Sequence, residues 1–312
     1  MSEEINGAYD WQKKVIEMTN NHRVVGVVAA NQSGKSELGC TIAAYHAVGL
    51  YPDWWEGRKY DRPVKIMVAG VDNYHNKHVI QDKLLGSSNW RLKEERGTGM
   101  IHKDHVIEES AVTFRGDDLS TIKIKHVSGG MSEIVFRSYS QGREAAQGLQ
   151  ADVVIIDEQP QDDFLYEALV STAATKGHVI CSFTPVLDMT DLLEKLMTLK
   201  PLDDCPEDKF GPKYRSQDGW AMVRATWEDI THISEEDKLQ LRNGFTVDEA
   251  NARTYAIQTT NGGWELRKGV NIYDLARQGD VNKLAKRIEE LEARLDDNDR
   301  KLKILRRAMG GK

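Results

Sequence analysis

Residues 24–37 read VVGVVAANQSGKSE, an apolar run, then a turn-rich break, then the start of a helical pattern. The run from Val24 to Ala30 is rich in β-branched residues, as a buried strand requires. From Lys35, the segment KSELGCTIAAYHAV has helical spacing. The break ends in Gly-Lys-Ser, as does the phosphate-binding loop pattern Gly-x4-Gly-Lys-Ser/Thr. Ala29 replaces the first glycine, which a strand end tolerates if φ stays negative. Strand, loop and helix in this order predict an α/β fold with a nucleotide site.

The loop itself supplies the first candidate site residues. Backbone N–H groups and the N-terminus of the following helix surround a phosphate in such loops. Lys35 would reach the β- and γ-phosphates of ATP, and Ser36 would hold Mg²⁺. The expected ATP-binding residues of the loop are Asn31, Gln32, Ser33, Gly34, Lys35, Ser36 and Glu37.

A second apolar run, ADVVIIDEQP at 151–160, ends in two carboxylates. Its four consecutive β-branched residues, Val153–Ile156, predict a strand buried on both faces. ATP hydrolysis needs a carboxylate in the Mg²⁺ shell and a residue that orients water. Asp157 would supply the first and Glu158 the second. An ordinary strand end also explains Asp-Glu, but its place downstream of the phosphate-binding loop favours the catalytic interpretation.

Three further candidates carry weaker signals. HVICSF at 178–183 predicts another strand, followed by Thr184-Pro185, where a polar group would sense the γ-phosphate or simply begin a turn. Gln12 precedes the first strand, and its amide has the donor and acceptor needed to read adenine; a surface role explains it too. Arg143, in SYSQGREAAQGLQ, is a candidate arginine finger from a neighbouring subunit, or else a solvated ion-pair residue. Its competitors are Arg115, Arg137 and Arg253.

Composition narrows the class of protein. Since no run approaches about 18 apolar residues, the sequence predicts no membrane-spanning helix. The N-terminus, MSEEINGAYDW, has neither the basic nor the apolar region of a signal peptide. The cysteines, Cys40, Cys181 and Cys205, are few and widely spaced, which favours a reducing cytoplasm and no metal cluster, with Cys40 and Cys181 in the core. A net charge of −7 counts mildly against nucleic-acid binding, yet permits a local basic face.

Over roughly residues 8–265 the chain resembles the ATPase domain of the large terminase subunit, the DNA-packaging motor of tailed bacteriophages. The order and number of similar segments make the resemblance specific. Besides the phosphate-binding loop they are GLYPDWWEG (49–57), RPVKIMVAG (62–70), QDKLLG (81–86), HVSGGMSEIVFRSYSQGREAAQG (126–148), ADVVIIDEQP (151–160), CSFTP (181–185), WEDITHIS (227–234) and DEANARTY (248–255).

The resemblance implies a fold, cofactors and residue roles. The fold is a P-loop NTPase of the RecA-like (ASCE) class: a mostly parallel sheet with helices on both faces and an additional strand beside the P-loop strand. The cofactors are ATP and Mg²⁺. The implied roles are adenine reading for Gln12, catalysis for Lys35, Glu158 and the trans-acting Arg143, metal binding for Ser36 and Asp157, and coupling of hydrolysis to movement for Ser182 and Thr184.

The resemblance also implies partners. The motor is a homo-oligomeric ring, expected to be a pentamer on the portal protein, with double-stranded DNA through its centre. The small terminase subunit is a further partner, no membrane is involved, and the expected location is the cytoplasm of the host bacterium. Asn31 and Gln32 stand where many relatives have an arginine in the loop, so another group must sense the γ-phosphate.

The end of the sequence departs most from the family. Large terminases usually continue into an RNase H-like nuclease, and the residues after Gly269 are too few for one. We therefore expect a motor domain at 1–268, a linker at 269–280 and no nuclease domain. Apolar residues at heptad spacing predict a coiled-coil-like helix at 281–309. It either folds back on the ATPase domain or pairs with another copy, the small terminase, the portal or a separately encoded nuclease.

Two rival functions remain open on the residues alone. A helicase-like or clamp-type P-loop ATPase would also act on nucleic acid, but a helicase needs a second RecA-like domain, for which the chain has no room. A regulatory module that binds ATP without hydrolysing it would have no use for Glu158.

Overall fold

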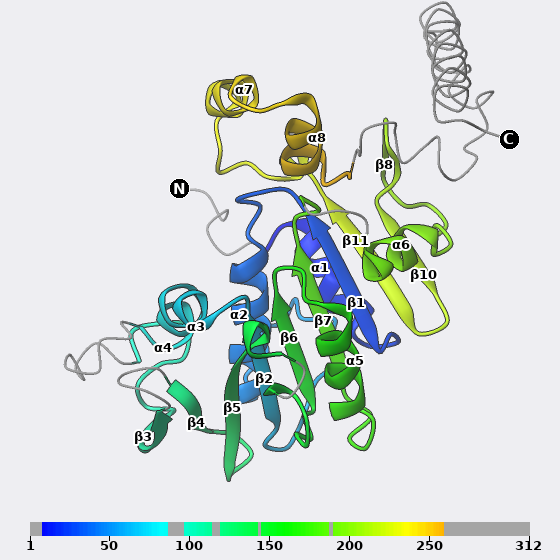
Figure 1. The fold of residues 1–312 in the computed structure, drawn as a ribbon. Helices are drawn as coiled ribbons and strands as arrows, with labels where there is room; N and C mark the ends of the chain where they lie inside the picture. The colour runs from blue at the N-terminus through cyan, green and yellow to red at the C-terminus, as the bar shows by residue number, and fades with distance from the viewer. Residues whose placement is uncertain (1–7, 87–96, 114–118, 143–144, 187–189, 259–312) are drawn as a thin grey trace, which may run out of the picture. The chain divides into compact units, whose positions relative to one another are not determined.

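The computed structural model describes residues 8–86, 97–113, 119–142, 145–186 and 190–258 (Figure 1). These residues belong to one compact unit that ends at Gln258. Arg143, the predicted linker and the predicted helix at 281–309 lie outside the described residues. Their roles, and the division of the chain into motor domain, linker and helix, stay predictions.

A nine-stranded sheet runs through this unit in the order β10-β11-β1-β7-β6-β2-β5-β4-β3. The strands from β11 to β5 in this order are parallel, and the antiparallel strands lie at the two edges. β7 lies between β1 and β6, so the mostly parallel sheet and the additional strand beside the P-loop strand are confirmed. The strands are β1 (Val24–Ala29), β2 (Lys65–Gly70), β3 (Val106–Thr113), β4 (Leu119–Lys125), β5 (Met131–Ser138), β6 (Val153–Asp157), β7 (His178–Phe183), β10 (Tyr214–Gln217) and β11 (Trp220–Ala225); β8 (Glu207–Asp208) and β9 (Gly211–Pro212) form a separate ribbon.

Helices cover both faces of the sheet, which explains why β1, β6 and β7 are buried along their whole length (Figure 1). Successive strand residues point to opposite faces. Val27 and Ile155 therefore pack into one apolar core with α1 (Asp10–Met18) and α2 (Lys35–Val48). Val28 and Val154 pack into the other, with α5 (Asp162–Ser171) and α6 (Asp191–Thr198). The remaining helices are α3 (Asn73–His75), a π-helical turn (Asn76–Gln81), α4 (Asp82–Leu85), α7 (Glu235–Asn243) and α8 (Val247–Tyr255), with 3₁₀ turns at Tyr139–Gln141 and Trp227–Asp229.

The predicted strand, loop and helix of the opening motif are all present. α2 starts at Lys35 after Gly34, which has φ 97°, and ends before Gly49, which has φ 80°. Both glycines adopt the left-handed conformation that favours this residue. Ala29 is outside the set of residues with positive φ, so a small side chain suffices at this strand end as expected.

Two buried histidines lie at the opposite end of the parallel strands. His178 begins β7 and His46 is near the end of α2; their ring centroids are 5.5 Å apart. Tyr60 stacks on His178, with an interplanar angle of 11°. Among the described residues, Nε2 of each histidine has no hydrogen-bond partner. Burial lowers the pKa of His178 to about 3, helped by Arg58 and opposed by Asp152, and burial lowers the pKa of His46 well below its usual range.

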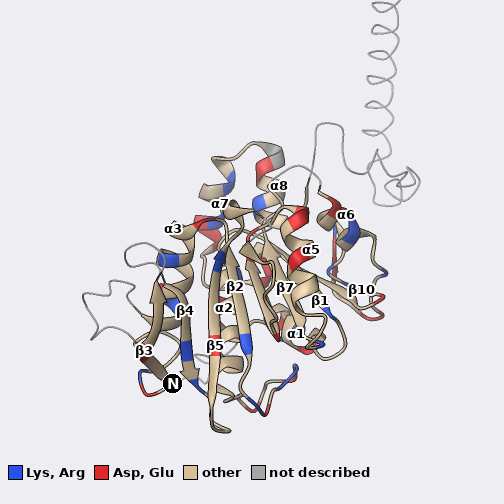
Figure 2. Ribbon diagram, turned by 60° about the horizontal axis from the view of Figure 1, so that its bottom comes forward, with Lys and Arg blue, Asp and Glu red and all other residues tan. Residues whose placement is uncertain are grey.

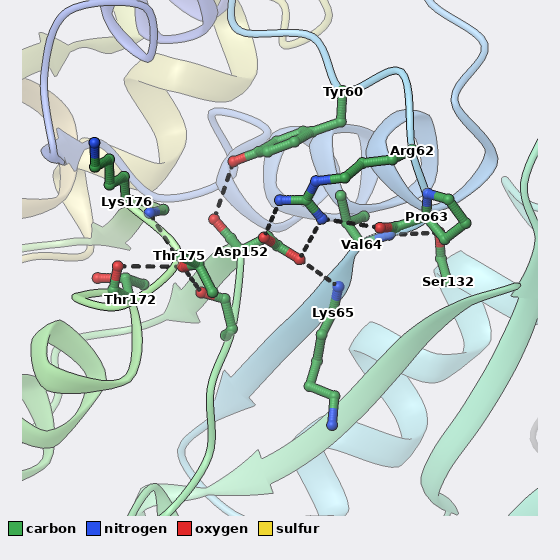
Figure 3. A network of polar contacts seen from close by, with 12 residues as sticks. Tyr60, Arg62, Pro63, Val64, Lys65, Ser132, Asp152, Thr172, Thr175 and Lys176 are labelled. Atoms are coloured by element: carbon green, nitrogen blue, oxygen red, sulfur yellow. Dashed lines mark hydrogen bonds and ion pairs between the residues drawn. The ribbon is translucent and has the colours of Figure 1, made fainter. Parts of the chain in front are cut away.

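A polar network beside these histidines joins the starts of β2 and β6 (Figure 3). The Arg62 guanidinium donates to both carboxylate oxygens of Asp152, at 2.7 and 3.3 Å. The backbone N–H of Lys65 also donates to that carboxylate, at 2.9 Å, and the Tyr60 hydroxyl donates to the Asp152 carbonyl, at 3.1 Å. The Asp152 side chain is 7% exposed and that of Arg62 is 52% exposed, so the network links a buried carboxylate to a half-exposed cation.

Cys40 and Cys181 are buried free thiols, as predicted for core residues. No helix within the described ranges has the length and apolar character needed to cross a membrane. Figure 2 shows basic residues on β4 and acidic residues on α5. The β4 cations are Lys123 and Lys125, both exposed.

Candidate nucleotide-binding and hydrolysis site

The predicted site residues meet where β1, β6 and β7 end. The carboxyl ends of parallel strands form the usual ligand-binding edge of an open α/β sheet. The Lys35 ammonium donates to Thr184 Oγ1 at 2.7 Å and to the Ala30 carbonyl at 3.0 Å. Thr184 Oγ1 in turn donates to the Ala29 carbonyl at 2.9 Å. The loop lysine and the strand-end threonine are therefore in direct contact, although 149 positions separate them in the sequence.

The loop between β1 and α2 has the backbone shape of an anion-binding turn. Gln32 (φ 56°) and Gly34 (φ 97°) both adopt left-handed conformations, which curve successive N–H groups around a concavity. The Ser33 hydroxyl is buried and has no hydrogen-bond partner within the described part of the chain. Gln12 Nε2 donates to the Gly34 carbonyl at 3.3 Å, and Gln12 Oε1 accepts from the Tyr9 N–H at 2.9 Å. Gln12 thus supports the loop directly, and its reading of adenine stays a prediction.

Asp157, at the end of β6, is held by hydroxyls from two neighbouring elements. Ser36 Oγ donates to Asp157 Oδ2 at 2.7 Å, and Ser182 Oγ donates to Oδ1 at 3.2 Å. The Asp157 side chain is only 3% exposed. The two predicted metal ligands are therefore within hydrogen-bonding distance, and the two predicted coupling residues contact Asp157 and Lys35 respectively.

Glu158 has a left-handed backbone, with φ 72°. Non-glycine residues rarely adopt this conformation, and such outliers cluster at functional sites. Its N–H donates to the Ser182 carbonyl at 2.8 Å, which fixes the backbone against β7. Burial raises the pKa of Glu158, opposed by the nearby Lys35. Burial lowers the pKa of Lys35, and the nearby Glu158 and then Asp157 oppose this shift.

A cleft of about 630 Å³ lies over the loop. Its size is within the range of small-molecule and cofactor sites. It brings together predicted residues and three that the sequence did not single out as site residues, Tyr9, Lys83 and His232. The full lining is Tyr9, Gln12, Asn31, Gln32, Gly34, Lys35, Ser36, Glu37, Lys83, Glu158 and His232.

The segment after β11 holds the loop from outside. Trp227 Nε1 donates to the Asn31 carbonyl at 2.8 Å, and the Asn31 N–H donates to the Arg253 carbonyl at 2.9 Å. His232 Nε2 lies 2.9 Å from the Gln32 carbonyl, which can only accept, so this nitrogen is the donor. These contacts fix the two loop residues that stand where many relatives have an arginine. No local pattern in the sequence indicated these contacts.

His75 also contacts Asp157, and no sequence pattern indicated this role. Its Nε2 lies 2.9 Å from Asp157 Oδ2. This hydrogen bond raises the pKa of His75 above its usual value, against the effect of burial. The only available signal was its position shortly after the apolar run that forms β2, which places it at the same sheet edge.

Comparison with known proteins shows to which family the chain belongs. The profile of the family described as terminase large subunit, T4likevirus-type, N-terminal, matches residues 27–269. The chain belongs to this family. It is also similar to the large terminase subunit of Salmonella phage P22, with 28% identity over 274 residues, which cover 82% of the chain and 51% of that relative. The chain thus spans about half the length of the curated relative it matches.

Solved structures of terminases share the fold. The large terminase ATPase domain of Thermus phage P74-26 has a TM-score of 0.55 at 14% identity, over 80% of this chain and 93% of that one. The large terminase of a thermophilic bacteriophage, in complex with ADP, has a TM-score of 0.52 at 11% identity, over 80% of this chain and 53% of that one. At these identities the likeness concerns the fold alone.

Proposed function

We propose that this chain is the ATP-hydrolysing motor part of a phage DNA-packaging terminase. The observation that carries the proposal is that Lys35, at the start of α2, and Asp157 and Glu158, at the end of β6, meet at one edge of the sheet beside a cleft, in a member of the terminase family. A regulatory module that only binds ATP would not need a half-buried carboxylate on a left-handed backbone at position 158.

The residues fit ATP and Mg²⁺. The buried, unpartnered Ser33 hydroxyl and the left-handed turns at Gln32 and Gly34, within the described part of the loop, provide a cradle for phosphate. The Ser36 hydroxyl and the Asp157 carboxylate are the hard oxygen ligands that Mg²⁺ prefers. Bound Mg²⁺ would neutralise charge that develops on the phosphates. Lys35 would exchange its contacts with Thr184 and Ala30 for phosphate oxygens.

The remaining catalytic roles follow from position. Glu158 faces the cleft and would orient the attacking water through its carboxylate. Ser182 and Thr184, which contact Asp157 and Lys35, would sense whether the metal and phosphate are bound and pass this to the motor. In this way they would also sense the γ-phosphate in place of an arginine in the loop. Arg143 would complete the site of a neighbouring subunit.

The proposed partners follow from the family. Hydrolysis would drive double-stranded DNA through a homo-oligomeric ring, a pentamer, on the portal protein in the host cytoplasm, with the small terminase subunit as a further partner. Residues 281–309 would pair with another chain, such as a second copy, the small terminase subunit, the portal protein or a separately encoded nuclease.

Phosphate release by the purified chain, with and without Mg²⁺, tests hydrolysis. Lys35→Ala and Glu158→Gln should each reduce turnover by at least about 100-fold, with Lys200→Ala and Glu236→Gln, at exposed positions, as matched controls. Normal turnover in either site variant would refute the assignment. Glu158→Gln should still bind ATP, because the loop contacts are intact.

Arg143→Ala tests the trans-acting arginine. It should bind ATP but not hydrolyse it, and mixing it with Glu158→Gln should restore part of the activity under conditions that favour assembly. If activity is not restored, Arg143 either acts in the site of its own subunit or has only a structural role.

A further inference from the structure

Asp157 accepts hydrogen bonds from three elements, and one of the donors has no assigned role. Ser36 of α2 donates to Oδ2 and Ser182 of β7 donates to Oδ1. His75 of α3 also contacts Oδ2, at 2.9 Å through Nε2. Because a carboxylate only accepts, Nε2 carries the proton in this contact.

The chain around His75 is built so that its ring reaches Asp157. Gly70 ends β2, and a Cβ there would lie 2.8 Å from His75 Cδ2 and 2.5 Å from Asn76 Oδ1. Asp72 caps the turn by accepting from the His75 N–H at 2.7 Å. Asn76 Nδ2 donates to the Arg137 carbonyl at 2.6 Å. A π-helical turn follows at once, a rare conformation that is frequent at functional sites.

We propose that His75 is a positioning residue that holds the Asp157 carboxylate in the orientation required for Mg²⁺. This inference rests on the proposed function. With Mg²⁺ present, the Ser36 hydroxyl would be a metal ligand, and His75 and Ser182 would be the residues that hold the carboxylate. Partners of this kind, behind a metal ligand, typically change metal affinity by about 10–100-fold when they are removed.

The His75 imidazole contributes little to the packing of the apolar cores. The His75 side chain is 23% exposed, and the residue is in neither apolar core of the sheet. The next residue on its N-terminal side, Tyr74, is 74% exposed. Removing the imidazole therefore leaves the cores of the sheet intact and removes chiefly the hydrogen bond to Asp157.

Mg²⁺ titrations of the purified chain test the proposal. The readout is binding of a fluorescent, non-hydrolysable ATP analogue, first in EDTA and then with increasing Mg²⁺. His75→Leu should bind the analogue like wild type in EDTA but need about 10-fold more Mg²⁺ to reach half of the metal-dependent increase. His75→Gln, which keeps an N–H donor at similar reach, should return the midpoint to within about 3-fold of wild type. His78→Leu, on the same helical segment, is the control.

The outcomes separate the positioning role from the proposed function. If wild type shows no Mg²⁺-dependent binding, the proposed function fails. If wild type responds to Mg²⁺ and folded His75→Leu has the same midpoint, the positioning role is overturned while the function stands. Should His75→Leu fail to fold, Gly70→Ala decides, since it keeps the histidine but displaces the ring; a wild-type midpoint in that variant also overturns the proposal.

Discussion

The buried His178 should make the chain lose stability in mild acid. In the folded chain burial holds its pKa at about 3, whereas an unfolded histidine titrates near 6.5. As the pH falls below 6.5, only the unfolded state takes up the proton, so the free energy of unfolding decreases until about pH 3. Each pH unit in this window is worth about 1.4 kcal/mol, so His178 alone should remove about 2 kcal/mol between pH 7.5 and pH 5. His46 acts in the same direction.

Urea unfolding of wild type and His178→Phe at pH 7.5 and pH 5 measures this effect. Phenylalanine keeps a ring against Tyr60 and His46. It removes Nε2, which has no hydrogen-bond partner among the described residues, and Nδ1, whose contact with the Tyr60 hydroxyl is long, at 3.4 Å. The variant should be close to wild type at pH 7.5 and about 2 kcal/mol more stable than wild type at pH 5. His102→Gln, at an exposed position, controls for loss of an imidazole. An equal difference at both pH values would refute the reasoning.

Three further substitutions test contacts described above. Asp152→Ala should cost about 1–3 kcal/mol in urea unfolding because it leaves the part-buried backbone N–H of Lys65 unpaired. Arg62→Ala should cost less than about 1 kcal/mol because the cation is half exposed; equal losses would contradict this. Thr184→Val should leave ATP affinity within about twofold and lower turnover about tenfold, the worth of one hydrogen bond; unchanged phosphate release would exclude a coupling role. Trp227→Phe should weaken ATP binding by about fivefold, measured by calorimetry, because the Asn31 carbonyl loses its donor; wild-type affinity would show that this contact does not shape the loop.

The parts of the site that follow buried strands could be predicted from the sequence. α2 and β7 have the predicted bounds, because runs such as HVICSF carry the buried-strand pattern in the residues themselves. Asp157 contacts Ser36 and Thr184 contacts Lys35 because parallel strands bring their carboxyl ends to one edge. His75, Trp227 and His232 could not be found this way. Their partners are distant in sequence, and nothing local distinguishes a histidine that contacts a carboxylate from one on the surface.

The pairing and direction of the strands at the edges of the sheet could not be predicted from local sequence patterns either. β3 and β4 add to the sheet in the antiparallel direction, with register shifts between Ile107 and Thr113. Strand periodicity states which residues face the core but not which neighbour a strand chooses or in which direction. The mostly parallel sheet was implied by the family resemblance, and the residue pattern did not place the strands at its edges.

Because Glu158 has a left-handed backbone, selection for stability and selection for ATP hydrolysis favour different residues at this position. An L-residue in this conformation costs roughly 1–2 kcal/mol that glycine avoids, and burial of the carboxylate adds to that cost. A laboratory selection that rewards only heat resistance would therefore enrich glycine at this position and discard the proposed catalytic carboxylate. Thermostabilised versions of this chain should be selected with ATP turnover as a second criterion.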